Sequence, residues 1–405
     1  PEVGARYDTK VTDTGLRMTI ADREVPSQEV PYAIADLVLP RIAAKGIRRF
    51  FPEVMSESDV TVRGLERKLD HGVHGDLHCA SVCATHRFLP SEFWGGLKAW
   101  RYMADKAHSL GIEIGAWFAP HFAPAAAIFR EHPEYRMVCQ NTLPWGGGYG
   151  INTITTADWN TGLFDWVLND IRRWKEEGGL DYLFTDSWAN LGLVEMNYAA
   201  NMRTNLKPLA RLYHEFQKLG LCSFTFEGIS PFGASRFGLA DLRGDLMEAR
   251  GGIVGQNDFG WWVGNEDMAI GICACVPSRK RTQDELAGLE FRFMANRGFI
   301  MYDDQYGMMY ELPDWWTRLN FTYLQALPHM KVRRLLPDGQ GVCWTDGQAE
   351  VLWAYKDFAL PVRADASLER LDGKEAVRVE NTGALQAAAG SVYRIVGCPA
   401  AKAGV

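Results

Sequence analysis

One structural unit recurs along this chain: an amphipathic helix, then a glycine, then a short apolar strand that ends in a charged or aromatic residue. In the clearest copy, apolar residues from Phe164 to Trp174 fall at helical spacing, Gly178-Gly179 ends the helix, and a strand runs to Asp186. Four more copies pair helices 33–44, 97–110, 206–219 and 286–296 with strands 47–53, 112–118, 222–227 and 299–303. Because a helical crossover joins parallel strands, the repetition predicts a parallel sheet covered by helices.

The number and spread of these units predict the fold class. Units spread over roughly 300 residues favour a (β/α)8 TIM barrel over an open doubly wound sheet, and no G-x-G-x-x-G or phosphate loop follows a predicted strand. After about residue 335, short alternating strands separated by Asp-Gly and Asn-Thr-Gly turns predict a small antiparallel β domain. We therefore predict an α/β fold with an N-terminal strand segment (1–30), a (β/α)8 catalytic barrel (31–335) and a C-terminal β-sandwich-like domain (336–405).

Composition excludes several classes of partner. The 405 residues are 47% hydrophobic and 23% charged, as in a globular chain with a substantial core. The net charge of −7 and the lack of a basic run argue against nucleic acid and anionic membranes, and no apolar run approaches the roughly 18 residues of a membrane span. The eight cysteines are scattered, which favours reduced thiols in a cytoplasmic protein, with a secreted protein as the alternative. The sequence leaves a homo-oligomer open.

The strand ends carry the residues that suggest chemistry. Barrel enzymes hold their catalytic groups at the carboxyl ends of the strands, and Asp186 stands at such an end. A loop cap or a structural ion pair is the alternative role for this carboxylate. Tryptophan is frequent, with 14 residues, and Trp117 and Trp188 lie near predicted strand ends. Flat indole faces suit the apolar faces of sugar rings, although a core role is the alternative for each of them.

Three segments in this order resemble a known family. They are HSLGIEIGAWFAP at 108–120, FREHPE at 129–134 and LDYLFTD at 180–186, and further matches lie at 88–97, 227–236 and 274–277. The series is similar to glycoside hydrolase family 36, the α-galactosidase or melibiase group. The resemblance covers roughly residues 31–335, and residues 336–405 correspond to the C-terminal β domain of that family. It implies a retaining α-glycosidase that uses no metal and no cofactor.

The resemblance assigns roles to individual residues. Asp186 matches the nucleophile of the family, and Asp245 and Glu248 match the spacing of the carboxylates around its acid/base, with Asp258, Glu266 or Asp267 as alternatives. Independently of the family, cleavage of a glycosidic bond requires one carboxylate to stabilise the oxocarbenium-like transition state and a second, protonated one to donate to the leaving oxygen. The expected substrate-binding residues are Glu53, Asp76, Trp117, His121, Trp188, Glu227 and Arg236.

The chain also departs from the family where the sugar is recognised. The family carries acidic residues after its first strand and after the Trp-Phe pair, and a Lys-Trp pair before the nucleophile. Here the matching residues are Glu53 with its neighbours, Ala119 and His121, and Phe184 with Thr185. A ligand that loses a charged partner in a buried pocket loses about 1–3 kcal/mol for each unpaired group. We therefore expect a substrate other than galactose.

A second group of residues supports a competing hypothesis. Residues 70–86 contain four His, two Cys and two Asp, all of which are side chains that bind zinc. Their spacing matches no established zinc pattern, and the alternative is a loop whose His and Asp residues contact substrate or cap turns. A metal-dependent barrel hydrolase or lyase that uses the His71–His86 cluster is thus one alternative function. A carbohydrate-binding barrel without catalytic activity is the other.

Overall fold

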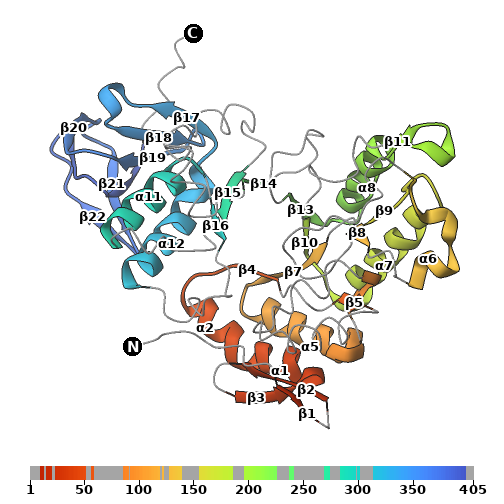
Figure 1. The fold of residues 1–405 in the computed structure, drawn as a ribbon. Coiled ribbons are helices and arrows are strands. Elements are labelled where there is room, and N and C mark those ends of the chain that lie inside the picture. Colours follow the sequence, from red (N-terminus) through yellow and green to blue (C-terminus); the bar gives the residue numbers. More distant parts are fainter. Residues whose placement is uncertain are drawn as a thin grey trace. The chain divides into compact units, whose positions relative to one another are not determined.

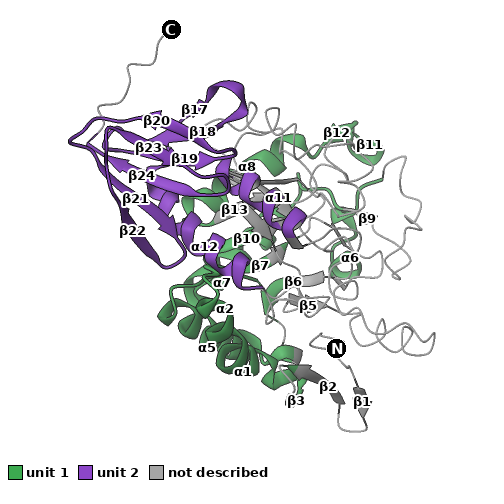
Figure 2. Cartoon of the chain, turned by 90° about the vertical axis from the view of Figure 1, so that its left-hand side faces the viewer, with its two compact units in different colours: residues 1–241 green, residues 242–405 purple. Residues whose placement is uncertain are grey.

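The computed structural model describes 15 stretches of the chain, and they form two compact units (Figure 2). The units comprise Pro1–Asp241 and Leu242–Val405. The described residues are 10–12, 15–20, 23–51, 56–58, 85–90, 92–118, 121–122, 127–138, 155–185, 196–225, 237–240, 269–273, 283–297, 299–301 and 313–397.

A parallel sheet forms the centre of unit 1 (Figure 1). Its strands, in spatial order, are β14 (Phe237–Ala240), β13 (Cys222–Thr225), β10 (Tyr182–Thr185), β7 (Glu113–Phe118) and β4 (Arg49–Phe50). Each neighbouring pair is parallel, as the recurring helix–strand units predict. The expected strand 47–53 is paired over β4 alone in the part of the chain that the structure describes.

Three long helices lie between these strands along the chain. They are α5 (Gly96–Ser109), α7 (Leu163–Gly178) and α8 (Leu206–Lys218). All five apolar positions that predicted α7 are buried, which are Phe164, Val167, Leu168, Ile171 and Trp174. The helices are followed by Gly111, Gly179 and Gly220, each with positive φ, a conformation that glycine adopts without steric cost. The predicted helices and their glycine ends are thus confirmed.

The N-terminal part of unit 1 comprises an antiparallel sheet followed by an irregular helix. The sheet contains β1 (Lys10–Thr12), β2 (Gly15–Ile20) and β3 (Arg23–Pro26). The helical segment contains α1 (Val30–Ala33), a π-helical turn (Ile34–Val38) and α2 (Leu39–Ala44). Pro40 explains the π turn, because its nitrogen cannot donate to the carbonyl four residues earlier and its ring crowds that carbonyl.

The remaining elements of unit 1 are short and lie mainly between the sheet strands and the following helices. They are β5 (Ser56–Ser58), β6 (Thr85–Pro90), β8 (His121–Phe122), α6 (Ala127–Glu131), β9 (Thr155–Thr156), β11 (Met196–Asn197) and β12 (Arg203–Thr204), with 3-10 turns at Ser27–Glu29, Glu92–Trp94, Pro133–Tyr135 and Tyr198–Ala200.

Unit 2 combines a parallel strand pair and two helices with a C-terminal antiparallel sheet. Its first elements are β15 (Ala269–Cys273), α11 (Gln283–Ala295), β16 (Phe299–Met301) and α12 (Asp314–Ala326), followed by a 3-10 turn (Leu327–His329). The sheet strands, in spatial order, are β17 (Val332–Leu335), β18 (Gly341–Thr345), β19 (Ala349–Ala354), β24 (Val392–Val396), β21 (Ser367–Asp372) and β22 (Glu375–Val379), with a 3-10 turn at Pro337–Gly339. A separate pair contains β20 (Phe358–Pro361) and β23 (Ala384–Ala387). The antiparallel sheet predicted for the C-terminal residues is confirmed.

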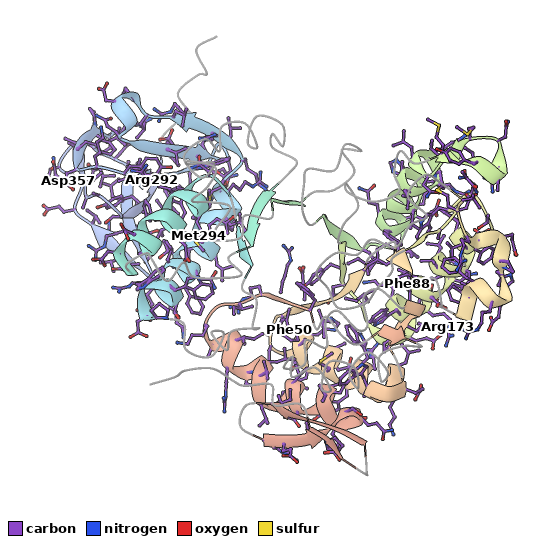
Figure 3. The ribbon with its side chains drawn as sticks, viewed as in Figure 1. Phe50, Phe88, Arg173, Arg292, Met294 and Asp357 are labelled. Carbon is purple, nitrogen blue, oxygen red and sulfur yellow. The ribbon has the colours of Figure 1, made fainter. Side chains whose placement is uncertain are left out.

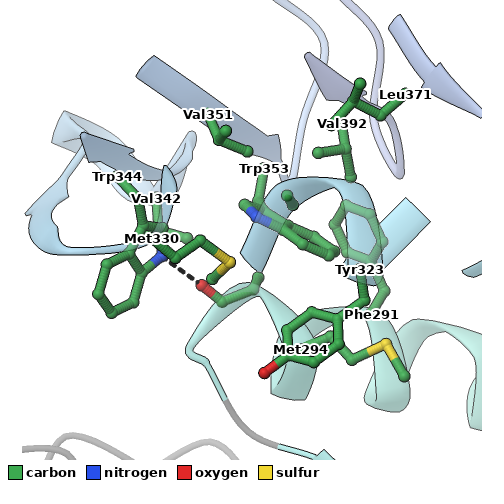
Figure 4. Close-up of a cluster of buried hydrophobic side chains, with 12 residues drawn as sticks. Phe291, Met294, Tyr323, Met330, Val342, Trp344, Val351, Trp353, Leu371 and Val392 are labelled. Carbon is green, nitrogen blue, oxygen red and sulfur yellow. Dashed lines mark hydrogen bonds between the residues drawn. The ribbon is translucent and has the colours of Figure 1, made fainter. Parts of the chain in front are cut away.

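The central strands of the C-terminal sheet are buried on both faces. On one face, Val351 and Trp353 pack against α11 and α12, and Trp344 Nε1 donates to the Ala295 carbonyl at 2.8 Å (Figure 4). On the other face, Leu352 joins a second apolar cluster with residues of β20 and β23. Two-sided cover explains why all six residues of β19 are buried, whereas one-sided cover leaves every second residue exposed.

Two further observations bear on the sequence predictions. The described chain after α11 turns at Arg297, whose φ is 62°, and the expected glycine at 298 lies outside the described residues. The boundary between the compact units lies at 241/242, so β15, α11, β16 and α12 belong to the unit of the C-terminal sheet. The predicted domain division at 335/336 stays a prediction.

Among the described residues, no helix is both long and apolar enough to cross a membrane.

Candidate functional site

Three central strands of unit 1 end at the same level. Thr185, the last residue of β10, is in register with Phe118 of β7 and with Thr225 of β13. Phe118 and Thr225 are likewise the last residues of their strands. The segments that leave β7, β10 and β13 therefore start from one edge of the sheet, which is the edge where barrel enzymes bind substrate. We call it the carboxyl edge.

The sheet at this edge has one face toward the helices and one face away from them. The centroid of the Phe118 ring lies 5.7 Å from the centroid of the Phe216 ring in α8 and 4.9 Å from that of the Phe88 ring in β6. Figure 3 labels Phe88. Alternate residues of a strand point to opposite faces, so Gly115 belongs to the face away from α8. On that face, a Cβ atom at Gly115 would overlap the Tyr182 ring of β10. Tyr182 therefore occupies the side of the sheet opposite to Phe216.

The structure describes the backbone at two of the predicted site residues. Trp117 lies in β7, in register with Phe184 of β10, and His121 lies in β8, paired with Thr156 of β9. The structure thus places the strand of Trp117 beside the strand that precedes Asp186. The other expected site residues lie outside the described residues, which are Asp186, Asp245, Glu248, Glu53, Asp76, Trp188, Glu227 and Arg236, together with the alternatives Asp258, Glu266 and Asp267.

The His/Cys cluster falls almost entirely outside the described residues as well. His86 lies in β6, and residues 70–84 are not described. Within the described stretches, no three His, Cys, Asp or Glu side chains are grouped so that they could hold a metal ion. The metal hypothesis therefore stays a prediction that concerns residues 70–86.

A buried carboxylate joins the two chain segments that leave β7 and β10. Asp158 belongs to the segment 119–162, between β7 and α7, and its side chain is fully buried. From the segment 186–205, between β10 and α8, Asn197 Nδ2 donates to Asp158 Oδ2 at 2.6 Å and Arg203 Nε donates at 2.8 Å. Asp158 Oδ1 accepts from the backbone and side-chain nitrogens of Asn160, both at 3.0 Å. Both carboxylate oxygens are therefore occupied.

The same interactions determine the charge of Asp158. Burial raises the pKa of the carboxyl, but the hydrogen bonds from Asn160, Arg203 and Asn197 lower the pKa by more than burial raises it. The carboxylate is therefore ionised and saturated with donors, so it has no free acceptor with which to take a proton from substrate. Its role is to hold the two segments together.

Asparagine side chains complete this junction. Asn205 Oδ1 accepts from the Trp159 backbone at 3.0 Å, and its Nδ2 donates to the Ala157 carbonyl at 2.9 Å. Asn197 Oδ1 accepts from the Val138 backbone at 3.2 Å. Since buried amide groups are costly when unpaired, these bonds determine how the segments meet. We call Asp158, Asn197, Arg203 and Asn205 the loop junction.

The charged groups at the opposite, amino end of the sheet have a different arrangement. Asp181 precedes β10, and its Oδ2 accepts from His108 Nε2 at 2.7 Å and from the Ile114 backbone at 2.8 Å. Arg49 pairs with Glu113 where β4 and β7 begin. At this end of a parallel barrel such pairs stabilise the fold and lie away from the chemistry. Asp181 and Asp186 therefore flank the same strand at opposite ends.

The loop junction was not predicted from the sequence. One local signal was present, because Asp158 and Asn160 stand just before the start of α7 and form an Asx turn. Asn197 and Arg203 are 39 and 45 positions from Asp158, and nothing in their local sequence points to it. Asp170 was also missed. It is buried within α7 and accepts a hydrogen bond from the Phe88 backbone at 3.1 Å.

Among the comparisons with known proteins, only the comparison of three-dimensional structures finds similar proteins. No protein-family model matches the sequence, and no curated protein matches it. A maltogenic α-amylase from Thermotoga neapolitana is similar over 91% of this chain and 94% of its own, with a TM-score of 0.60 and 12% identity. An α-amylase from Geobacillus thermoleovorans, complexed with acarbose, is similar over 91% of this chain and 92% of its own, with a TM-score of 0.60 and 9% identity.

A family 36 enzyme is also similar. The α-galactosidase from Geobacillus stearothermophilus, in complex with 1-deoxygalactonojirimycin, matches 91% of this chain with a TM-score of 0.52 and 14% identity. The match covers 53% of that enzyme, so this chain spans about half its length. At these identities the likeness concerns the fold alone, and the similar proteins are barrels with a C-terminal β domain. It supports the barrel implied by the family 36 resemblance without singling out family 36, because α-amylases match as well.

Proposed function

We propose that this protein is a glycoside hydrolase that cleaves an α-glycosidic bond with retention, and that residues 31–335 form its (β/α)8 barrel. The main support is the level carboxyl edge, where β10 ends at Thr185 beside Phe118 and Thr225. Asp186 is the next residue in the sequence, and in the proposed site its side chain continues the alternation of the strand and shares the face of Tyr182, away from the helices. The α-amylases and the α-galactosidase that share the fold act on α-glycosides, which supports this substrate class.

The proposed mechanism uses two carboxyl groups. The Asp186 carboxylate attacks the anomeric carbon while a protonated carboxyl, Asp245 or Glu248, donates its proton to the leaving oxygen. The glycosidic bond breaks, the aglycone leaves as an alcohol, and the sugar remains as an ester of Asp186. The second group, now ionised, takes a proton from water, which attacks the anomeric carbon and regenerates the Asp186 carboxylate. The sugar leaves with its original configuration.

The proposed substrate-binding set suggests a pocket unlike that of an α-galactosidase. Glu53, His121 and the Phe184-Thr185 pair stand where the family carries its recognition acids and Lys-Trp pair. Such a pocket is less acidic and more apolar, which suits a sugar with fewer hydroxyl groups to satisfy or with an anionic or acylated substituent near His121. Asp76, Trp117, Trp188, Glu227 and Arg236 complete the proposed set. We expect p-nitrophenyl α-galactoside to be a poor substrate.

The strand β10 provides a matched pair of aspartates for the test. Asp186→Asn should lower kcat by about three orders of magnitude or more on whichever aryl α-glycoside the wild type cleaves, because it removes the nucleophile. Asp181→Asn, at the other end of the strand, removes the carboxylate that is hydrogen-bonded to His108 and should lower the unfolding midpoint while kcat of the folded protein stays near that of wild type. Circular dichroism establishes that both variants are folded.

Three results would contradict the proposal. Near-normal turnover by Asp186→Asn would exclude this residue as nucleophile. Activity that is lost on chelation and restored by zinc would favour the His71–His86 cluster. Sugar binding without turnover of any α-glycoside would indicate a binding protein.

A further inference from the structure

A short hairpin in unit 1 exposes an unusual set of apolar side chains. It comprises β11, a 3-10 turn and β12, and Figure 1 shows it next to α8. Tyr198 is 51% exposed and Met202 is 49% exposed. The other exposed apolar residues of the hairpin and its neighbouring segments are Met196, Val138 and Leu206. Exposed apolar groups that are concentrated in one segment are typical of a binding surface, whereas single ones are ordinary.

The loop junction holds this hairpin in place. Asn197 and Arg203, which face each other across the hairpin, both donate to the buried Asp158. Met196 pairs with Thr204, one position along each strand, and therefore belongs to the opposite face. The Tyr198 backbone donates to the Val138 carbonyl at 2.7 Å. The exposed side chains are thus carried by a backbone that buried polar bonds fix in position.

The turn of the hairpin is strained in a way that presents Met202. Asn201 and Met202 have φ of 52° and 61°, a left-handed conformation that is uncommon for residues other than glycine and unfavourable for a long side chain such as methionine. Such a conformation persists where the surrounding contacts determine it, and it is concentrated at functional sites. Here the Met202 nitrogen donates to the Asn197 carbonyl at 3.0 Å, which ties the strained turn to the loop junction.

The position of the hairpin relates it to the proposed catalytic residue. The segment 186–205 begins at Asp186 and ends with this hairpin, and its partner Val138 belongs to the segment that leaves the adjacent strand β7. Both segments start from the carboxyl edge, since Phe118 and Thr185 are in register there. The exposed residues are therefore carried by the same chain segment that would present the nucleophile to the substrate.

Charge and chemistry indicate the kind of ligand. Arg203 is the one charged residue between positions 196 and 206, and its guanidinium pairs with Asp158. The other exposed side chains of the hairpin are those of a tyrosine, two methionines, an alanine and Asn201. A neutral pyranose offers apolar C–H faces to the ring and hydroxyl groups to the amide, whereas an anionic ligand would find no free cation on this hairpin.

We propose that this hairpin is a second contact for the substrate, which binds further sugar units of an extended neutral oligosaccharide whose reacting unit lies at Asp186. The inference rests on the proposed function and narrows it, because it names a substrate of several linked sugars in place of a small glycoside. The rigid hairpin would then hold the chain of sugars without having to become ordered when it binds.

The test measures binding of maltoheptaose and of stachyose to the full chain by isothermal titration calorimetry. Asp186→Asn serves as the background so that neither sugar is consumed. Tyr198→Ala should weaken binding of whichever sugar the background protein binds by roughly 3- to 10-fold, the usual effect of losing one aromatic stacking contact. Met202→Gly removes the exposed thioether and also relieves the left-handed backbone, so it should weaken binding while it raises the unfolding midpoint.

The matched control is Tyr102→Ala. Tyr102 lies in α5, is 43% exposed, and donates to Asp36 Oδ1 at 3.0 Å, so it is a tyrosine of similar exposure away from the hairpin. Its replacement should leave binding unchanged. Equal affinities for wild type and Tyr198→Ala, or no binding of either sugar, would overturn the inference. A dimer in sedimentation that Tyr198→Ala dissociates would overturn it in favour of a second copy of the chain.

These results separate this inference from the proposed function. If turnover depends on Asp186 but the affinity for the oligosaccharide is unchanged in the Tyr198 and Met202 variants, only the proposed hairpin contact is overturned. Binding that depends on Tyr198 in a protein that hydrolyses no α-glycoside would overturn the proposed hydrolase and retain the sugar-binding hairpin.

Discussion

Arg203 Nη2 lies 2.7 Å from Oδ2 of the fully buried Asp158, and this ion pair joins two chain segments that leave adjacent strands. The carboxylate takes its remaining bonds from Asn160 and Asn197. A barrel enzyme needs the segments at its carboxyl edge to be held in fixed positions, because small displacements of catalytic groups lower the rate strongly. The loop junction therefore links the stability of unit 1 to the geometry of the proposed active site.

Replacing Asp158 should destabilise the protein. In Asp158→Asn, a neutral amide replaces the ionised carboxylate. Its NH2 group cannot accept a hydrogen bond, so the donors of Asn197 and Arg203 that bind this position lose their acceptor. We expect a loss of about 2–4 kcal/mol in the free energy of unfolding, measured by urea denaturation. Asp165→Asn is the control, because Asp165 is exposed in the first turn of α7 and should cost only tenths of a kcal/mol. Equal losses in the two variants would show that the junction contributes little.

The acid/base residue should be identified by leaving-group dependence. Removing it slows substrates with poor leaving groups far more than activated aryl glycosides, because the latter need little protonation. We expect Asp245→Ala to show this selective loss and to recover rate with azide, with Glu248→Ala as the second candidate. If neither variant does so, the same measurement on Asp258, Glu266 and Asp267 follows, and the proposed assignment is wrong.

Gly115 should tolerate no side chain. In Gly115→Ala, the added methyl group would overlap the Tyr182 ring of the neighbouring strand, and overpacking of this kind costs about 1–3 kcal/mol. Adding Tyr182→Leu should recover part of the loss. Gly288→Ala is the control, because Gly288 lies in α11 and no atom of another described element is within 4 Å of its Cβ position, so alanine should stabilise that helix by about 0.5–1 kcal/mol. Thermal unfolding compares the variants, and a neutral Gly115→Ala would contradict the packing of Tyr182 against β7.

Asp346 should make stability depend on pH in the acid range. Backbone donation from Ala349 and the hydrogen bond with His329 lower the pKa of Asp346 from 3.8 to about 2. Because the folded state has the lower pKa, this carboxylate stabilises the protein fully above about pH 4 and loses that contribution as the pH falls toward 2. The stability difference between wild type and Asp346→Asn, measured by urea denaturation, should therefore shrink as the pH falls from 4 toward 2. A difference that grows over this range would contradict this assignment.

Much of the secondary structure could be predicted from the sequence because its signals are local. The spacing of Phe164, Val167 and Ile171 determines the buried face of α7, and Gly179 ends that helix because its left-handed φ is cheapest for glycine. Alternating helices and strands likewise predicted parallel pairing, which the register of β7, β10 and β13 confirms. The position of Asp186 directly after β10 follows from the same local pattern.

Only the tertiary structure determines the contacts between residues that are far apart in the chain. Asp158 meets Asn197 and Arg203 across 39 and 45 positions, and β19 is buried on both sides because separate elements cover each face. The identity of the second carboxylate depends on a contact of this kind, so Asp245 and Glu248 stay predictions. The physical reason is that helix periodicity and glycine φ are properties of a few neighbouring residues. The pairing of buried polar groups depends instead on how the whole chain folds, and the sequence around one group does not indicate which distant residue is its partner.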